Sequence, residues 1–456
     1  MTRSRLIENL KTVILVVLFL TTILLLYLLW GRSFTPSIAQ IFEPEGNSAP
    51  VNAADYIEPL YVACCDGNDS YSFAVDPRYE FIRSITNFAS YNSSEALLTE
   101  ISEATYREAM GTFRSEQICL GYNVPFTEFC EYFKIGRVMG ADSLEYMESF
   151  AFSEASKESV FVKDGKNNKY YRLLFAEGHE VPAAYKNDSF GIRYYAGDIL
   201  GGSSSALIPL AAESSLESLG FEADGQDRRE MAEAIFGDTF DFVRRITDSF
   251  GNITYMYGYG QKTLTSSVSG RFEYQAEVGA VEPLGFFKEM EAALDFAESF
   301  GGLNVPLVLS NAERTGGRSQ SYVFEFSQKI NGVRVCSENG PALTVEICGG
   351  QVTKANRFSA DVQPASSGAE PSAAAEPANV LANNCNHIYN ISTNSMLAVD
   401  QAQAYSYVAD SIKYLSLGYF ESEASGMLVP CWVAATDTAQ FYFDLYTAAP
   451  LGFERL

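Results

Sequence analysis

The sequence predicts an α+β protein with a single N-terminal transmembrane helix followed by extracytoplasmic domains, each built from an antiparallel sheet and helices. One observation is an uncharged apolar run near the N-terminus. Another is that helix-like stretches alternate with short strand-like runs in the rest of the chain. The chain has 456 residues, of which 47% are hydrophobic and 13% aromatic. This length corresponds to about three domains, and the composition is sufficient for packed cores.

The apolar run comprises residues 12–30, which read TVILVVLFLTTILLLYLLW and carry no charged side chain. As a helix, they would span roughly 28 Å, close to the hydrocarbon thickness of a bilayer. Three basic residues precede the run within residues 1–11, whereas only Arg32 follows it before Arg78. This asymmetry predicts a single-pass protein of the cell membrane, with residues 1–11 in the cytoplasm and the bulk of the chain outside.

A cleaved signal peptide is the alternative interpretation, because Ser37-Ile38-Ala39 resembles a cleavage site with small residues. The apolar run is longer than the roughly 7–15 residues typical of signal peptides, so we favour an uncleaved anchor. The run has no pair of small residues spaced for close backbone contact between helices. We therefore expect a partner helix to contact its threonines and two of its leucines: Thr12, Leu18, Thr21, Thr22 and Leu25.

Residues 31–55 are polar and contain proline, alanine and asparagine, which is typical of a stalk. Three domains are expected to follow, at 56–166, 167–281 and 282–456.

The first domain opens with the strand-like sequence IEPLYVACC. Helix-like stretches follow at 76–90 and 94–110, and Ser93 or Ser94 could cap the second of them.

The second domain contains a strand-like stretch at Lys169–Phe175 and a helix-like one at Arg228–Phe236. Three strand candidates come next, with Gly258 and Gly260 in the turn between the first two: 252–257, 262–268 and 270–276.

The third domain begins with an amphipathic helix at 286–300, which the pair Gly301-Gly302 is expected to end. Strand candidates follow, and Asn331-Gly332 between two of them is typical of a hairpin turn: 304–310, 320–328, 332–337, 342–348 and 351–356.

A further helix is expected at 399–415, and a closing hairpin at 427–435 with 440–446. Residues 361–380 contain three prolines and no aromatic or basic residue, so they are expected to form a disordered insert within the third domain.

Eight cysteines lie outside the apolar run, at 64, 65, 119, 130, 336, 348, 385 and 431. An even number in an exported chain permits disulfides. Cys336 and Cys348 lie on successive strand candidates and are the most testable pair, and Cys385 with Cys431 is possible in the same domain. The alternative, that most are buried free thiols packed as small apolar groups, stays open.

The residues that catalysis or cofactor binding would need are sparse. The formal net charge of −25 argues against a nucleic-acid partner, which needs a basic surface. Only two histidines occur, His179 and His387, and both are interpreted as surface residues. The sequence Gly202-Ser-Ser-Ser-Ala206 fails the G-x-S-x-G pattern at its last position. We expect no catalytic residues, no cofactor and no metal.

Several stretches together resemble the YycH family and its relative YycI. The basic segment and anchor RSRLIENLKTVILVVLFLTTILLLYLLW resemble the family's N-terminus. Further stretches resemble it from residue 228 to 456: IFGDTFDFVRRITDSFGNITYMYGYGQKTL, ALDFAESFGG, YVFEFSQKINGVRV, ALTVEICGGQVTKANR and LGYFESEASGMLVPCWVAATDTAQFYFDLYT. The chain departs from the family pattern at Leu303, where an aromatic residue is expected, and in the insert at 361–380.

This resemblance implies a non-enzymatic regulator with a YycI-like or PepSY-like C-terminal domain. Such proteins act on the WalK/WalR two-component system through transmembrane helices and extracytoplasmic domains. The implied partners are a sensor histidine kinase and a YycI-like sibling regulator in the membrane, and a homodimer is possible. The family carries no catalytic residues, so none is transferred to this sequence.

Two other classes of function stay open. One is an extracytoplasmic peptide-binding, solute-binding or peptidase-inhibiting module of the PepSY type, which would act by adding a strand at a sheet edge. The other is an extracytoplasmic enzyme, which would need a deep pocket with converging ionisable groups.

Overall fold

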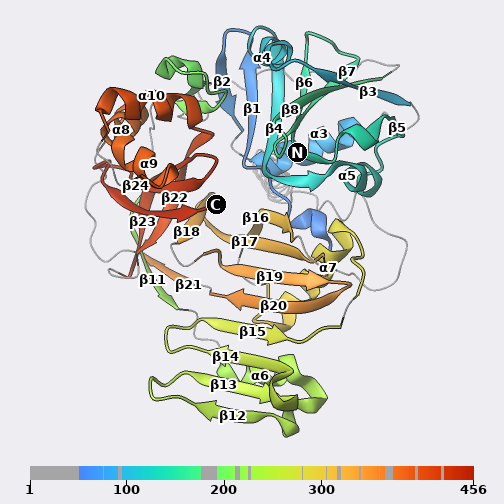
Figure 1. The fold of residues 1–456 in the computed structure, drawn as a ribbon, viewed down its shortest axis with the longest axis vertical. Coiled ribbons are helices and arrows are strands. Elements are labelled where there is room, and N and C mark those ends of the chain that lie inside the picture. The colour runs from blue at the N-terminus through green and yellow to red at the C-terminus, as the bar shows by residue number, and fades with distance from the viewer. Residues whose placement is uncertain are drawn as a thin grey trace, which may run out of the picture. The chain divides into compact units, whose positions relative to one another are not determined.

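The computed structural model divides the chain into two units, Met1–Ser48 and Ala49–Leu456. It describes residues of the second unit only: 51–74, 76–90, 95–175, 193–210, 216–223, 227–279, 281–303, 306–315, 320–337, 340–358, 360–364, 373–395, 399–422 and 426–456. In these residues two large sheets carry most of the fold, and helices pack on their faces (Figure 1).

The first sheet has ten strands in the order β10-β9-β2-β1-β4-β6-β7-β8-β3-β5, antiparallel except for the pair β3–β5. Its strands are β1 Tyr61–Asp66, β2 Ser70–Phe73, β3 Ala96–Ile101, β4 Arg114–Pro125, β5 Val138–Met139, β6 Tyr146–Ser153, β7 Ser159–Asp164, β8 Lys169–Leu174, β9 Arg193–Ala196 and β10 Leu207–Pro209. Its helices are α3 Pro77–Ser90, α4 Glu103–Gly111 and α5 Phe126–Tyr132.

Helix α3 follows from its apolar spacing, because Phe81, Ile85 and Phe88 recur on one face and are fully buried. Phe88 packs against Phe150 and Phe152 of β6, with ring centroids 5.6 and 6.3 Å apart. The two β6 rings are two residues apart and therefore lie on the same face of the sheet. The strand at IEPLYVACC and the helix at 76–90 are both confirmed.

The predicted helix at 94–110 is wrong in its first half. Residues Ala96–Ile101 form strand β3, which pairs with β8, and α4 begins only at Glu103. The Oγ of Ser102 accepts the Thr105 N–H at 3.1 Å and caps this helix, whereas Ser93 and Ser94 lie outside the described residues. Pairing with a neighbouring strand has overridden the local helical pattern.

The second sheet has fifteen strands in the described part of the chain. Its main path is β12-β13-β14-β15-β20-β19-β17-β18-β22-β23-β11-β21, with β16 beside β17 and β24 between β23 and β25 (Figure 1). The strands are β11 Leu219–Ala223, β12 Arg244–Thr247, β13 Ile253–Tyr257, β14 Lys262–Ser266, β15 Phe272–Ala276, β16 Leu307–Arg314, β17 Tyr322–Ile330, β18 Val333–Ser337, β19 Leu343–Cys348, β20 Gln351–Arg357, β21 Ala360–Pro364, β22 Tyr414–Ser422, β23 Met427–Ala435, β24 Ala439–Asp444 and β25 Pro450–Arg455.

The helices that accompany the second sheet are α6 Arg228–Phe236, α7 Phe286–Ser299, α8 Pro377–Asn383, α9 Cys385–Ser392 and α10 Gln401–Ser411. Short 3-10 helices complete the elements: Ala53–Asp55, Ala141–Ser143, Gly197–Leu200, Gly237–Phe242 and Gly258–Gly260.

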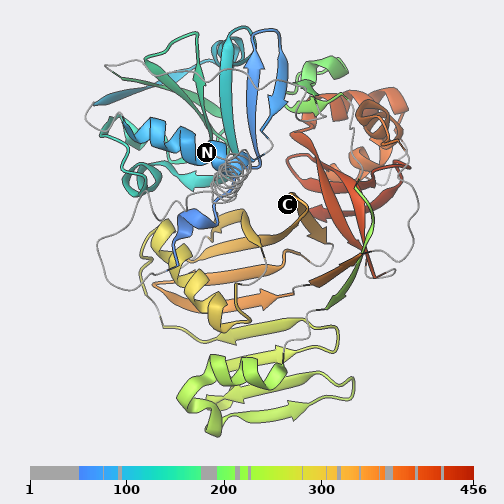
Figure 2. The same cartoon turned by 180° about the vertical axis from the view of Figure 1, so that it is seen from behind.

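The expected strands and turns of the second sheet are largely confirmed. Asn331 and Gly332 have φ values of 50° and 81°, as a tight hairpin turn between β17 and β18 requires. Gly301 and Gly302, at φ 96° and 79°, follow the end of α7, which lies along one face of strands β17, β19 and β20 (Figure 2). The strands expected in the second domain correspond to β13, β14 and β15.

The sheets do not follow the expected domain boundaries. Strand β15 pairs with β20, so one sheet continues across the boundary predicted at 281–282. Strands β8, β9 and β10 belong to the first sheet, although the second domain was expected to begin at 167. A boundary read along the chain cannot reveal such pairings, because they join segments distant in sequence.

Both ends of the segment 361–380 differ from the expected disordered insert. Its start belongs to β21, which pairs with β11, and its end belongs to α8. Backbone pairing with β11 provides hydrogen-bond partners for β21, and at the other end of the segment Pro377 and Val380 of α8 are buried. Residues 365–372 lie outside the described part of the chain.

Two further expectations are corrected. The helix expected at 399–415 ends at Ser411, and β22 begins at Tyr414. The expected stalk at 31–55 is described only from residue 51, where Ala53 and Ala54 are fully buried. The Tyr132 hydroxyl donates to Asn52 Oδ1 at 2.6 Å, so this end of the stalk packs on the first sheet's helix α5.

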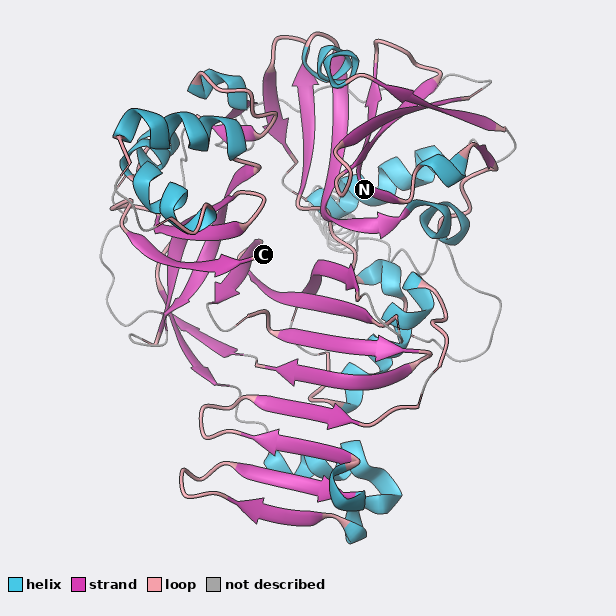
Figure 3. Ribbon diagram, viewed as in Figure 1, coloured by secondary structure: helices cyan, strands magenta, loops and turns pink. Residues whose placement is uncertain are grey.

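Helices α8, α9 and α10 cover one face of strands β22–β24 (Figure 3). Trp432 lies at the centre of this layer, and its Nε1–H donates to the Ala375 carbonyl oxygen at 3.1 Å. No helix among the described residues is long and apolar enough to cross a membrane, and the expected span at 12–30 lies outside them.

Candidate functional site

The side chains expected to contact a partner helix cannot be placed. Thr12, Leu18, Thr21, Thr22 and Leu25 all lie outside the described residues. Contact through this helix therefore stays a prediction.

The possible disulfide between Cys336 and Cys348 is not formed, and none of the eight cysteines is in a disulfide. The Cys336 side chain packs with Cys431, Val433 and Tyr442 of β23 and β24. The Cys348 thiol instead donates to the carbonyl oxygen of Val281 at 3.3 Å, at the far end of β19. The two thiols thus lie in different surroundings, and burial raises the pKa of Cys336 to about 12. Cys385 and Cys431 are likewise unbonded.

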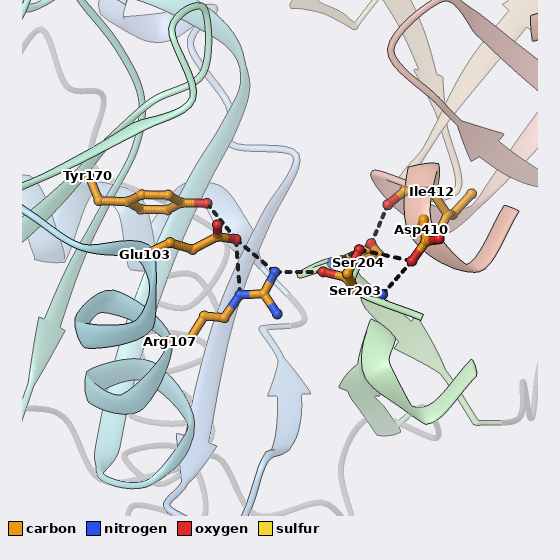
Figure 4. Close-up of polar contacts among 8 residues, drawn as sticks. Glu103, Arg107, Tyr170, Ser203, Ser204, Asp410 and Ile412 are labelled. Atoms are coloured by element: carbon orange, nitrogen blue, oxygen red, sulfur yellow. Dashed lines mark hydrogen bonds and ion pairs between the residues drawn. The ribbon is translucent and has the colours of Figure 1, made fainter. Parts of the chain in front are cut away.

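The serine-rich segment that resembles a nucleophile motif has a structural role. The N–H and Oγ of Ser203 donate to Asp410 Oδ1 at 2.7 and 2.9 Å, and the Ser204 Oγ donates to the Ile412 carbonyl oxygen (Figure 4). Arg107 of α4 donates to the Ser203 carbonyl oxygen at 2.7 Å. A Cβ at Gly202 would lie 2.2 Å from the Ala409 carbonyl oxygen, so the glycine permits this close approach. The segment joins α4 of the first sheet to the end of α10.

His387 is half-buried on α9 and is not the surface residue that was expected. Its ring lies 6.0 Å from Phe441 and 6.4 Å from Phe443 between ring centroids. Burial lowers its pKa, and its Nε2 has no hydrogen-bond partner among the residues that the structure describes. An apolar environment favours the neutral ring, so His387 packs as an aromatic residue. His179 lies outside the described residues.

The strongest candidate site is a cavity of about 790 Å³ that the two sheets line together. Its walls come from strands β1, β2 and β9 of the first sheet, strands β16–β18, and strands β22–β25. A volume of this size lies within the range of pockets that bind small ligands. Residues from segments far apart in sequence therefore meet at one site.

The wall from the first sheet is aromatic. The rings of Tyr61 and Phe73 stack with centroids 4.6 Å apart, and those of Phe73 and Tyr194 stack with centroids 3.5 Å apart. Strands β1, β2 and β9 are neighbours in the sheet, so the three rings form a continuous ladder. This wall offers a ligand an apolar, planar surface.

The wall from the C-terminal strands is a hydrogen-bonded row. The Tyr414 hydroxyl donates to Gln440 Oε1 at 2.9 Å, and Gln440 Nε2 donates to the Tyr442 hydroxyl at 3.2 Å. The Tyr442 hydroxyl donates to Glu454 Oε2 at 3.1 Å. Burial and repulsion from Glu325 raise the pKa of Glu454, while the Tyr442 hydroxyl lowers it.

The third wall carries charges of both signs along β17 and β18. Lys329 forms an ion pair with the buried Glu58, and Arg334 Nη2 donates to the Glu58 carbonyl oxygen at 3.4 Å. Glu325 accepts from Asn311 Nδ2 at 3.1 Å. Burial, together with repulsion from Glu313, raises the pKa of Glu325, although the Asn311 bond opposes this shift. The cavity thus combines an acidic end with a basic end.

These site residues were not identified from the sequence. The alternation of Glu325, Ser327 and Lys329 along one strand places polar groups on one face, and this was the available signal. It was ambiguous because the same pattern is typical of any half-exposed strand. Among the described residues, no group of three His, Cys, Asp or Glu side chains is arranged to hold a metal ion.

The fold and the cavity together define a two-sheet α+β protein with an internal space of ligand size. Among solved structures, the chain is similar to YycH from Bacillus subtilis, with a TM-score of 0.54 and 12% sequence identity over 86% of this chain and 96% of that chain. This similarity shows that the chain has the YycH fold, as the resemblance in its sequence implied.

The C-terminal domain of YpeB from Bacillus megaterium is also similar, with a TM-score of 0.29 and 11% identity over 52% of this chain and 99% of that chain. This second similarity is too low to define a shared fold. No protein-family model and no curated protein matches the chain.

Proposed function

We propose that the chain is a non-enzymatic, membrane-anchored regulator that modulates a sensor histidine kinase of the WalK type, together with a YycI-like sibling regulator. The observation that carries this proposal is the YycH fold, which extends over 86% of the chain. The apolar run at 12–30 supports an anchor, with the folded unit outside the membrane. In this proposal the chain acts by binding to the kinase.

Regulation by binding has an energetic requirement. The chain must have different affinities for the active and inactive states of the kinase, because equal affinity shifts no equilibrium. Contacts from the membrane helix and from the folded exterior can each supply part of this difference.

The test replaces residues 12–30 of the full chain with an unrelated apolar helix. We expect the variant to lose co-purification with the kinase and to change the output of the response regulator. In a matched control, Thr12, Leu18, Thr21, Thr22 and Leu25 are kept and only the other apolar positions are exchanged, and it should retain the complex. An unchanged complex and an unchanged output after full replacement would contradict contact through this helix.

A second candidate function, a binding module that adds a partner strand, is supported by the edge strand β12. Among the described residues β12 pairs only with β13, and all four of its residues are exposed. Apolar side chains surround it, with Phe242 77% and Phe250 80% exposed. Arg244 and Arg245 lie on the strand, so an acidic segment is the complementary partner. The same arginines also protect a free edge against aggregation.

Hydrogen exchange of the β12 amides distinguishes these two roles. An acidic peptide of alternating glutamate and valine should slow exchange at β12 in the full chain, and the double substitution Arg244→Glu and Ile246→Glu should abolish that protection. If the peptide does not change the exchange rates of the β12 amides, β12 does not bind a partner strand, and its arginines serve only to protect the free edge.

A further inference from the structure

The cavity between the two sheets contains acidic and basic groups that the proposed regulation does not use. We propose that it binds a short zwitterionic peptide, with the amine held by Glu325 and Glu454 and the carboxylate held by Arg334. This inference goes beyond the proposed function, because binding in the cavity requires no kinase and no membrane contact.

At the acidic end of the cavity two carboxylates have no cationic partner among the described residues, and Arg455, which also lines the cavity, donates instead to Asn394 Oδ1 at 3.1 Å. Glu325 of β17 and Glu454 of β25 both line it, and neither forms an ion pair with a described residue. Each carboxylate has one neutral donor, the Asn311 amide for Glu325 and the Tyr442 hydroxyl for Glu454. Burial raises the pKa of both groups, and Glu325 repels Glu454. A bound amine would relieve this repulsion and provide charge-assisted hydrogen bonds.

The basic end has two cations, Lys329 and Arg334, but only one carboxylate among the described residues beside them, that of Glu58. Lys329 and Arg334 lie opposite each other on β17 and β18, and both line the cavity. Lys329 is already neutralised by Glu58. Within the described part of the chain, Arg334 has only the 3.4 Å contact with the Glu58 carbonyl oxygen and forms no ion pair with a carboxylate. A guanidinium with free donors is well suited to a carboxylate.

The spacing of the two ends fits a peptide of three or four residues. Glu325 and Lys329 are four residues apart on one strand, which corresponds to roughly 13 Å. An extended peptide of three or four residues covers about 10–14 Å. The backbone positions of Glu325 and Lys329 thus lie about one short peptide apart, and Arg334 is paired with Lys329 across β17 and β18.

The aromatic wall favours an apolar side chain at the central residue of the ligand. Tyr61 and Phe73 face the same cavity as the charged strands, and their stacked rings offer a surface to an apolar side chain. A nucleotide or a phosphate could bind Arg334 but would bring no cation to Glu325 and Glu454, so its charge does not match both ends of the cavity. A peptide with an apolar central residue matches all three walls.

The test measures binding of the tripeptide Ala-Phe-Ala to the full chain in detergent micelles by calorimetry. Two blocked forms, N-acetyl-Ala-Phe-Ala and Ala-Phe-Ala amide, each lack one terminal charge. We expect each block to weaken binding by about tenfold to a hundredfold, as the loss of one charge-assisted hydrogen bond predicts.

Two variants test which terminus of the peptide each end of the cavity binds. Arg334→Gln should weaken binding of the free peptide at least about tenfold and should leave binding of the amide unchanged. Glu325→Gln should weaken binding of the free peptide and leave binding of the N-acetyl form unchanged. Lys169→Gln, which removes an exposed ion pair with Glu100 far from the cavity lining, is the matched control and should bind like the unaltered chain.

Three results would overturn the proposal. One is no binding of Ala-Phe-Ala at millimolar concentration to a chain that melts cooperatively. Another is equal affinity for the free and blocked peptides. The third is a variant that weakens all three peptides equally while its melting temperature matches that of Lys169→Gln. None of these results bears on kinase binding, so the proposed regulation would be unaffected.

Discussion

On one face of strands β22–β24, Leu415, Trp432, Ala434, Phe441 and Phe443 pack beneath helices α8–α10. On the other face of the same strands, Tyr414, Gln440 and Tyr442 line the cavity and bond to one another. The two sets alternate along each strand, so a single backbone supplies both faces. The covered face is apolar because helices exclude water from it, whereas the open face keeps polar groups available for a ligand.

We infer from this difference that the helix-covered face contributes mainly to the stability of the fold, and the cavity face to ligand binding. Truncation on a helix-covered face leaves a cavity in a close-packed layer, while a change on the cavity face removes single hydrogen bonds. We therefore expect large effects on unfolding from covered positions and small ones from the cavity. Charged residues buried beneath helices form a third group. The effect of replacing one of them on the free energy of unfolding depends on its protonation or on the backbone N–H groups that donate to it.

The largest effect is expected from Trp432→Ala on the covered face. Trp432 is fully buried, and its replacement should lower the free energy of unfolding by ~3–5 kcal/mol. Urea denaturation of the full chain measures this loss. Trp432→Phe, which keeps much of the volume, should lose clearly less, and equal losses for the two variants would argue against cavity formation as the cause.

Glu116 places a carboxylate on the face of the first sheet that α3 covers. It is 1% exposed, its Oε1 lies 2.6 Å from Arg83 Nη2, and burial raises its pKa to about 7 against an ordinary value of 4.5. The folded chain holds this proton more tightly than the unfolded chain, so stability is lost as pH rises from about 4.5 to about 7. The shift corresponds to roughly 3 kcal/mol at most.

Urea unfolding at pH 5 and at pH 8 checks this expectation. The unaltered chain should be less stable at pH 8 by an amount that Glu116→Gln removes in large part. Other buried carboxyl groups titrate equally in both chains, so the difference between the two pH dependences isolates Glu116. Identical pH dependences would show that Arg83 compensates fully for burial.

Glu289 of α7 is a buried acid whose carboxylate accepts hydrogen bonds from backbone N–H groups. Its carboxylate accepts the N–H groups of Leu284, Gly349 and Gly350 at 2.8, 2.6 and 3.0 Å, and so ties α7 to the turn between β19 and β20. Glu289→Gln should lower the free energy of unfolding by about 1–3 kcal/mol, because an amide accepts fewer of these bonds. The exposed Glu298→Gln on the same helix is the control and should be near neutral in the same urea titration.

The smallest effect is expected from Tyr442→Phe on the cavity face. The substitution removes the hydroxyl that bonds Gln440 and Glu454 but keeps the ring, so the free energy of unfolding should fall by only ~1 kcal/mol. The pKa of Glu454 should rise, because the hydroxyl lowers it in the unaltered chain. Carboxyl-labelled NMR titration checks the direction, and a loss as large as that of Trp432→Ala would erase the distinction between the two faces.

Helices and turns were predictable from the sequence where a few neighbouring residues define the backbone conformation. The pair Asn331-Gly332 and the apolar spacing of α7 each specify a backbone conformation within a few residues. Strand β3 was mistaken for a helix because its six residues have no strong alternation, and only its pairing with β8 defines it. The cavity was not predictable in the same way, since Tyr61, Arg334 and Glu454 come from strands more than a hundred residues apart.

The sequence by itself determined the apolar run at 12–30, about half of the described strands and most of the described helices after residue 56, and the resemblance to YycH, because each depends on neighbouring residues or on their order. Only the tertiary structure decided that β15 continues onto β20, that the cysteines form no disulfides, and that an aromatic ladder meets a charged strand across one cavity. Those features depend on which distant segments pair. That choice is made by the burial of whole sheet faces, which no short stretch of sequence encodes.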